Sequence, residues 1–238
     1  MNYFKIIKNY LNVIHKQIIS RKYYYSFGGI DLLVSNIFKN QINGFYVDVG
    51  AQHPVKNNNT YLLHKKGWHG INVDLDQKNI DLFNVNRKSD LNINAAIYSS
   101  EINMDLFYYH EGSPINTLSP DVSKFQKAEV REIRKTKTKT LNSIIKNTKF
   151  KDCEIDFLTI DVEGVELDVL KGLDLNFFKP KIIVVEYLDL KSKKLEIKNL
   201  NIHSVINSPI YDYITKNNYT MVNWLHSDIV FVNNSFRD

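Results

Sequence analysis

Short apolar runs alternate with helical patterns over most of the chain, and this alternation restricts the possible folds more than any other feature of the sequence. The runs Phe45 to Val49, Ile71 to Leu75 and Leu91 to Ile97 have the length and composition of strands. Helices are predicted between them, near Thr60 to Lys66 and Gln77 to Arg87. Strands that alternate with helices form a parallel sheet covered on both faces. The predicted fold class is therefore α/β.

The alternation returns later in the chain. Ile155 to Ile160 and Lys181 to Glu186 are predicted strands on either side of a helix at Val165 to Leu170, which Gly172 ends. Two further segments interrupt the pattern: Met104 to Tyr109 is a candidate extra strand, and residues 112–120 form a predicted loop. The basic stretch of residues 121–149 is predicted to hold a helix and one short strand, because residues 135–140 alternate Lys and Thr.

The C-terminal region predicts a hairpin. The runs Thr220 to Leu225 and Asp228 to Val232 follow a helix near Ile210 to Lys216 and are separated only by His226 and Ser227. A two-residue connection joins antiparallel neighbours, so we expect these strands at one edge of the sheet.

The first 43 residues form a predicted helical extension, and residues 44–238 a single larger domain. Apolar side chains recur at helical spacing over residues 3–20, with basic residues between them: Phe4, Ile7, Leu11, Ile14 and Ile18. We favour packing of this amphipathic helix onto the domain. The alternative is peripheral contact with a membrane surface through its lysines.

The 238 residues carry a net charge of +5, distributed unevenly. Residues 1–23 hold five Lys or Arg and no acid, and residues 121–151 hold ten against three. Such patches attract phosphate, anionic lipid or nucleic acid, or are simply solvated. We find no RNA-binding module and expect no nucleic-acid partner. The sequence shows no apolar run of about 18 residues, no uninterrupted signal-peptide core and one cysteine, Cys153, so we expect a cytoplasmic protein without a transmembrane segment.

Acidic residues end the predicted strands with unusual regularity. The strand ends read Asp48-Val49-Gly50-Ala51, then Asp74, then Asp161-Val162-Glu163-Gly164, and finally Glu186. For each acid taken alone, a structural role as a helix cap or a surface carboxylate is as good an explanation as a role in binding. Ligands of an open parallel sheet bind outside the carboxyl ends of its strands, so four acids at that edge predict a binding site.

The turn after the first strand indicates the kind of ligand. Gly50 and Ala51 let backbone approach a ligand closely, and Asp74 stands where a carboxylate accepts hydrogen bonds from the hydroxyls of a ribose. The turn reads GAQHPV, without the glycines of G-x-G-x-x-G, and the chain has no phosphate-binding GxxxxGK[ST]. A cofactor with a ribose and no phosphate fits better, and S-adenosyl-L-methionine is the common one.

These residues resemble the FkbM family of S-adenosylmethionine-dependent methyltransferases. The matching blocks run in the family's order over residues 44–233: FYVDVGAQHPVKNNNTYLLHKKGWHGINVDLD, RKSDLNINAAI, IDFLTIDVEGVELDVLKGL, KIIVVE and YDYITKNNYTMVNWLHSDIVFVN. The paired blocks DVGA and IDVEGxExxVLKG make the signature specific. The resemblance implies a Rossmann-like, seven-stranded class I methyltransferase sheet with helices on both faces and an antiparallel C-terminal hairpin.

The resemblance also implies cofactor contacts. Asp48, Gly50 and Ala51 match the motif around the methionine part, and Asp74 matches the residue that holds the ribose. Asp90, followed by Asn94 and Ala95, matches a position near the adenine. Asn59 and Thr60 match a polar pair, although Asn58 stands where family members often have Ser. Asp161 belongs to both the cofactor set and the catalytic set.

Methyl transfer to a hydroxyl needs alignment, and removal of the hydroxyl proton needs a base or a metal. Asp161, Glu163 and Glu186 are the predicted catalytic carboxylates. They act directly or through Mg²⁺, whose ligands would be Asp161 and Glu186. The structural alternatives are a helix cap for Glu163 and a lysine partner for Glu186.

Histidines and one loop supply weaker candidates. His53 is a candidate base, but we favour a hydrogen bond to backbone within its own turn. His226 is expected at the surface. His110, Asn116 and Thr117 lie in the irregular loop and are predicted to contact the acceptor.

The sequence thus predicts an O-methyltransferase that uses S-adenosylmethionine. The expected acceptor is a sugar hydroxyl in a surface polysaccharide, lipopolysaccharide or glycolipid pathway, an expectation taken from the family resemblance. The alternatives are a polyketide-type or other small hydroxyl compound, and a catalytically inactive module that binds cofactor or glycan.

Overall fold

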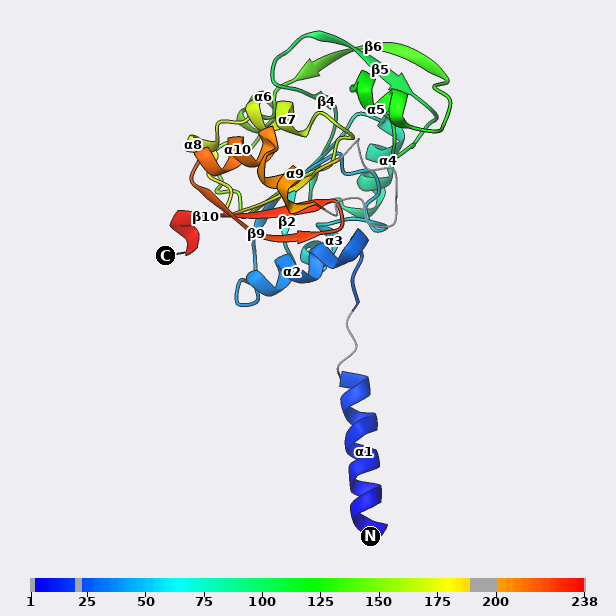
Figure 1. Cartoon of the computed structure of the whole chain (residues 1–238), viewed down its shortest axis with the longest axis vertical. Helices are drawn as coiled ribbons and strands as arrows, with labels where there is room; N and C mark the ends of the chain where they lie inside the picture. Colours follow the sequence, from blue (N-terminus) through cyan, green and yellow to red (C-terminus); the bar gives the residue numbers. More distant parts are fainter. Residues whose placement is uncertain (1–2, 20–22, 189–200, 238) are drawn as a thin grey trace.

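One seven-stranded sheet forms the centre of the protein (Figure 1). The computed structural model describes residues 3–19, 23–188 and 201–237. The strand order is β3-β2-β1-β7-β8-β10-β9, and every pair is parallel except the two that β10 makes with β8 and β9. The α/β class and the antiparallel hairpin are therefore confirmed. The strands of this sheet are β1 (Phe45–Val49), β2 (His69–Asp74), β3 (Leu91–Asn94), β7 (Phe157–Ile160), β8 (Ile182–Glu186), β9 (Tyr219–Leu225) and β10 (Asp228–Asn233).

Helices cover both faces of the sheet, as the sequence predicts. One face packs against α6, α7, α8, α9 and α10, and the other against α2 and α3. The helices are α1 (Tyr3–Ile19), η1 (Phe27–Gly29), α2 (Ile30–Ile37), α3 (Tyr61–Lys65), α4 (Gln77–Asn86), α5 (Pro120–Phe125), α6 (Leu141–Lys146), α7 (Glu166–Lys171), α8 (Leu175–Phe178), α9 (Ile202–Ile206), α10 (Pro209–Lys216) and α11 (Asn234–Arg237).

Alternation along the central strands explains the two hydrophobic layers. In β8, Ile183 and Val185 join the larger core cluster, whereas Ile182 and Val184 face the cluster around α2. Successive side chains of a strand point to opposite faces, so a strand buried on both sides is apolar throughout. This is why the continuous apolar runs of the sequence identify the central strands.

A second, three-stranded sheet contains the extra strand and the Lys/Thr strand. It consists of β4 (Ala96–Ile97), β5 (Asn103–Tyr108) and β6 (Glu132–Lys139), in the order β4-β6-β5. The single strand predicted over residues 91–97 is divided between the two sheets. The division falls at Ala95, whose amide donates a hydrogen bond to the Asp74 carbonyl oxygen, and Ala96 then pairs with Thr138 of β6.

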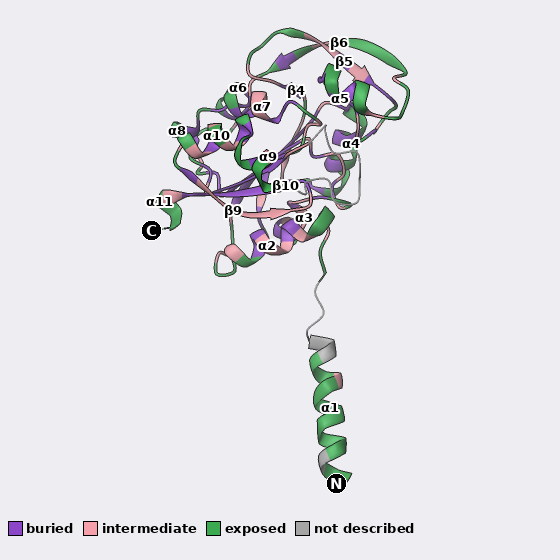
Figure 2. Cartoon of the chain, viewed as in Figure 1, coloured by how far each residue is buried: buried purple, intermediate pink, exposed green. Residues whose placement is uncertain are grey.

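The N-terminal helix forms as predicted but does not pack on the domain. Helix α1 stands away from the domain, and Figure 2 shows it largely exposed. The adjacent face of the sheet is already covered by α2, whose Ile30 and Val34 are fully buried. Ser20, the last residue of the predicted helix, lies outside the described residues. No helix among the described residues is long and apolar enough to span a membrane.

Candidate functional site

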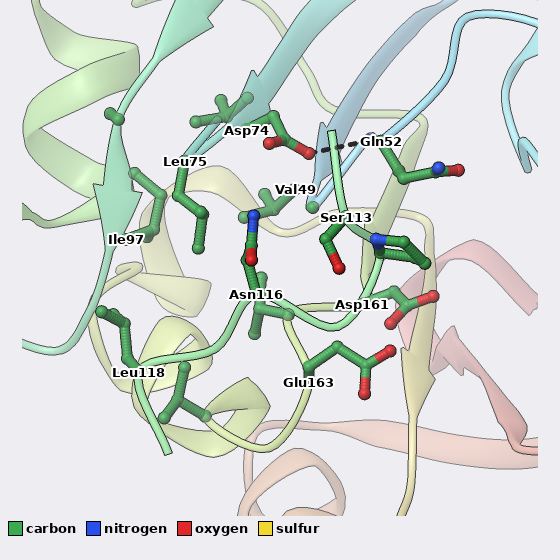
Figure 3. Close-up of a pocket in the computed structure, with 16 residues that line it drawn as sticks. Val49, Gln52, Asp74, Leu75, Ile97, Ser113, Asn116, Leu118, Asp161 and Glu163 are labelled. Carbon is green, nitrogen blue, oxygen red and sulfur yellow. Dashed lines mark hydrogen bonds between the residues drawn. The ribbon is translucent and has the colours of Figure 1, made fainter. Parts of the chain in front are cut away.

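Two adjoining pockets lie beyond the carboxyl ends of the parallel strands. The lining of the first includes Asp74, Leu75, Ile97, Asn116 and Leu118 (Figure 3). The second is the roomier of the two and lies between β8, the β9–β10 turn and the start of η1. Both pockets share one wall, which is formed by Gly50, Gln52, Pro114, Asp161 and Glu163.

The turn after β1 forms part of that shared wall and requires glycine. Gly50 has a φ of 79°, and a Cβ at this position would lie 1.7 Å from the Asp161 carbonyl oxygen. The Gly50 amide donates to the Val73 carbonyl oxygen at 2.9 Å, which fixes the turn against β2. The sequence predicts glycine here so that a ligand can approach the backbone. The structure adds a second reason, because the chain directly after β7 passes close to Gly50. Ala51 follows it as a buried residue.

Asp74 ends β2 and is almost completely buried in the first pocket. Its Oδ2 accepts a hydrogen bond from the Gln52 amide at 2.9 Å, the contact drawn in Figure 3. Its Oδ1 accepts from the Asp76 amide at 2.7 Å and the Asn79 side chain at 3.1 Å. A carboxylate has about four acceptor positions, so one remains on Oδ2. Burial raises the pKa of Asp74 to about 6.

A buried polar network behind the pockets holds the segment that follows the turn. The Arg87 side chain is fully buried and donates to the Pro54 carbonyl oxygen, to Asn58 and to Thr60. Asp48 accepts from Asn58 at 3.1 Å and from Thr60 at 2.9 Å. Burial raises the pKa of Asp48, and the charge of Arg87 opposes that rise. Asp48 and Thr60 therefore support the site from behind rather than line it.

Asp90 belongs to the same network and not to the first pocket. It precedes β3 and lies at the amino ends of the parallel strands, whereas both pockets lie beyond the carboxyl ends. Its fully buried carboxylate accepts hydrogen bonds from Tyr46, Asn72 and the Gly70 amide. Its predicted place near an adenine is thus not where the structure puts it. Of the residues that follow, Ala95 lines the first pocket, whereas the Asn94 side chain donates to the Asp74 carbonyl oxygen.

Three predicted catalytic carboxylates meet at the second pocket. One oxygen each of Asp161, Glu163 and Glu186 lies within 4.8 Å of the others. This spacing suits the predicted divalent cation, which stays a prediction. The pKa of Asp161 is raised well above its ordinary value. The causes are loss of solvation, the charges of Glu186 and Asp228, and a hydrogen bond with Glu186. Because Asp161 is exposed to the pocket, we attribute this rise chiefly to the neighbouring carboxylates.

The loop that carries Glu163 is held in a left-handed conformation. Glu163 has a φ of 58° and Gly164 a φ of 108°, and non-glycine residues rarely adopt such values. Glu166 accepts hydrogen bonds from the Val162 and Gly164 amides, and Thr117 Oγ1 donates to the Glu163 carbonyl oxygen at 2.7 Å. Backbone strain of this kind gathers at functional sites.

The remaining predicted residues are dispersed. His53 Nδ1 accepts from the Val55 and Lys56 amides, which matches the interpretation we favoured for it. His110 is exposed beside Glu111, and Asn116 lines the first pocket rather than the second. Thr117 is buried and acts on the Glu163 loop. Asn59 lines the second pocket and donates to Thr159 Oγ1 at 3.0 Å.

Part of the second pocket does not follow from the sequence pattern. Phe27, His226 and Asp228 line it, although they come from the two ends of the described domain. The rings of Phe27 and His226 meet edge to face, with centroids 4.5 Å apart. Asp228 pairs with Glu186 in the β8–β10 register. Asp228 stands out in the sequence as an acid at the start of an apolar run. Phe27 and His226 carry no such signal.

Residues 48–221 match the model of the methyltransferase FkbM domain. The chain belongs to the FkbM methyltransferase family. The resemblance seen in its motifs is confirmed, and so is the Rossmann-like methyltransferase fold. The protein is accordingly a methyltransferase of that family. No curated protein matches the chain.

The close approach of β7 to the turn predicts a large effect of a single methyl group in this FkbM domain. We expect Gly50→Ala to lower the free energy of unfolding by at least about 2 kcal/mol, because it adds both left-handed strain and a clash with Asp161. Gly29→Ala is the control: Gly29 has a φ of 85°, but a Cβ at this position would have no other atom within 4 Å. Urea unfolding measures both, and equal losses would contradict the proposed role of the close approach.

The buried guanidinium predicts a second stability effect. We expect Arg87→Met to cost about 3–5 kcal/mol, because it leaves Asp90 and the Pro54 carbonyl oxygen buried without their cationic partner. Lys88→Met places the same residue at an exposed neighbour and should change the unfolding midpoint little. If the two variants unfold at the same urea concentration, the network does not stabilise the domain.

Proposed function

We propose that this FkbM methyltransferase uses S-adenosyl-L-methionine to methylate a hydroxyl group, and that the acceptor is a sugar. The observation that carries the proposal is the shared wall between the two pockets. A donor in the first pocket and an acceptor in the second would meet at Gly50 and Asp161. Bound S-adenosylmethionine supplies an electrophilic methyl group, so the chain's own task is to align the acceptor oxygen with it.

The lining of the first pocket supports an adenosyl cofactor. Asp74 offers one remaining acceptor position to a ribose hydroxyl, because protein donors already occupy three of its four positions. Leu75, Ile97 and Leu118 give the apolar surface that a flat base needs. Gly50 admits the ligand to the backbone of the turn.

The second pocket supports a polyhydroxylated acceptor. Its lining combines carboxylates with the amides of Asn57 and Asn59 and the hydroxyl of Ser227. Such groups accept from and donate to sugar hydroxyls. The Phe27 and His226 rings add an aromatic surface of the kind that covers the apolar face of a sugar. The alternative, a polyketide-type acceptor, would need a pocket with a more apolar lining than this one.

The carboxylates at the junction would handle the hydroxyl proton. Crowding of Asp161 with Glu186 and Asp228 raises the pKa of Asp161, which makes its carboxylate a stronger base toward an acceptor hydroxyl. An acceptor hydroxyl placed beside them would lose its proton to the ionised member of the set. Asp161 and Glu186 are also the residues that would hold a Mg²⁺ ion, which would supply the acidity by lowering the pKa of the hydroxyl.

Cofactor affinity should depend on pH through Asp74. The raised pKa of about 6 means that Asp74 is increasingly protonated below pH 6 and then loses acceptor strength toward a ribose hydroxyl. We expect the affinity for S-adenosylhomocysteine to fall by up to about tenfold per pH unit below 6. Isothermal titration calorimetry from pH 5 to 8 measures this. Asp74→Asn should bind weakly at every pH, and a wild-type curve without a pH dependence would contradict the assignment.

Removal of single carboxylates tests the proton-handling role. Glu186 lines only the second pocket, so Glu186→Gln should lower kcat by about 10²–10⁴-fold with cofactor affinity nearly unchanged. Asp161→Asn and Glu163→Gln complete the series. Near-normal turnover of all three variants would reject the carboxylate role, and full activity in a chelator would reject the metal.

The acceptor class needs its own experiment. Cells with and without the gene are compared by mass spectrometry of their surface glycans and glycolipids. Loss of one methyl group from a sugar residue supports the proposal. Unchanged glycans together with a methylated small metabolite favour the polyketide-type alternative. Cofactor binding without any transfer favours an inactive binding module.

A further inference from the structure

Helix α1 presents an exposed apolar face along residues 3–11. Tyr3, Phe4, Ile7, Tyr10 and Leu11 lie on one side of the helix, since they recur at intervals of three and four. Their exposed fractions range from 46% for Ile7 to 85% for Phe4. Isolated apolar residues at a surface are ordinary, but a continuous exposed face of this size marks an interaction surface.

The opposite side of α1 is polar and carries positive charge. Lys8, Asn9, Asn12, His15 and Lys16 lie there and are exposed. Residues 1–23 contain no Asp or Glu, so no acidic side chain of this segment offsets the five basic ones. The face and the charge together have the pattern of helices that lie in the plane of an anionic membrane surface.

Charge also argues against the other possible occupants of the apolar face. Two copies of α1 packed together would bring like charges close without acidic partners between them, which opposes a helical dimer. The domain itself is not an occupant, because α2 already covers the adjacent face of the sheet. A negatively charged lipid surface satisfies both sides of the helix at once.

Exposed aromatic residues follow α1 in the sequence, and the last of them lies at the second pocket. Tyr23 and Tyr24 are exposed by 70% and 58%, and Phe27, exposed by 55%, lines that pocket. Aromatic side chains are favoured where apolar chains meet lipid headgroups. A helix held at a membrane would therefore keep Phe27, and with it the second pocket, within about eight residues of the bound helix along the chain.

We propose that α1 binds the surface of a membrane rich in anionic phospholipid, with its apolar face among the acyl chains and its lysines at the phosphates. This binding does not depend on the proposed function. Its consequence for the substrate, namely that the acceptor is a glycan linked to lipid, does rest on the proposed function.

Vesicle flotation with the full chain tests the apolar face. The probes are vesicles of phosphatidylcholine alone and of phosphatidylcholine mixed with phosphatidylglycerol. We expect binding to the mixed vesicles, and a loss of at least about tenfold for the double variant Ile7→Ser with Leu11→Ser. The matched control, Asn9→Ser with Asn12→Ser, places the same residues on the polar side and should bind within about twofold of the wild type.

A second pair of variants tests the charge. Lys8→Gln with Lys16→Gln should weaken binding to the mixed vesicles by at least about tenfold. Lys56→Gln with Lys88→Gln removes the same charge from exposed positions of the domain and should have little effect. All variants should unfold at the wild-type temperature, because none alters the core.

Three results would overturn the proposal. They are equal binding of the two serine variants, equal binding to both kinds of vesicle, and self-association in sedimentation experiments without lipid that the Ile7 and Leu11 changes abolish. Membrane binding without methylation of any glycan would leave the proposal intact and count against the proposed function alone.

Discussion

The buried guanidinium of Arg87 is the interaction on which the site most depends. It joins the Pro54 carbonyl oxygen, Asn58 and Thr60 at the back of the turn to the carboxylates of Asp48 and Asp90. A charge without water around it is tolerated only with a full set of hydrogen-bond partners. Those partners are the same groups that set the path of the chain after β1. The polar network therefore fixes the turn that the two pockets share.

The pockets have different chemistry because they use different parts of the same sheet edge. Asp74 and apolar side chains surround the first pocket, whereas carboxylates from β7, β8 and β10 gather at the second. At Gly50 no side chain stands between the two spaces. For a methyltransferase this arrangement has a clear use, because a transferred group must pass between the two ligands with water excluded.

Much of this arrangement could be predicted from local sequence. Strand ends, Gly50 and the acidic residues of β2, β7 and β8 all follow from periodicity and from the known ligand edge of a parallel sheet. Asp90 lies away from the first pocket because it precedes β3, at the amino ends of the parallel strands, whereas ligands bind beyond the carboxyl ends. Arg87 was missed because its burial depends on the loop after β1. His226 and Asp228 reach the pocket only through the pairing of β10 with β8, and helix α1 fits an amphipathic pattern that does not say which surface covers it.

The contact between Gly50 and the Asp161 carbonyl has a consequence for inhibitor chemistry. Since Gly50, Asp161 and the other residues of the shared wall line both spaces, a short bridge suffices to connect their occupants. Under the proposed function, compounds that tether a nucleoside to a carbohydrate fragment would engage both pockets at once. Their selectivity would come from the carbohydrate part, which would face Phe27 and His226.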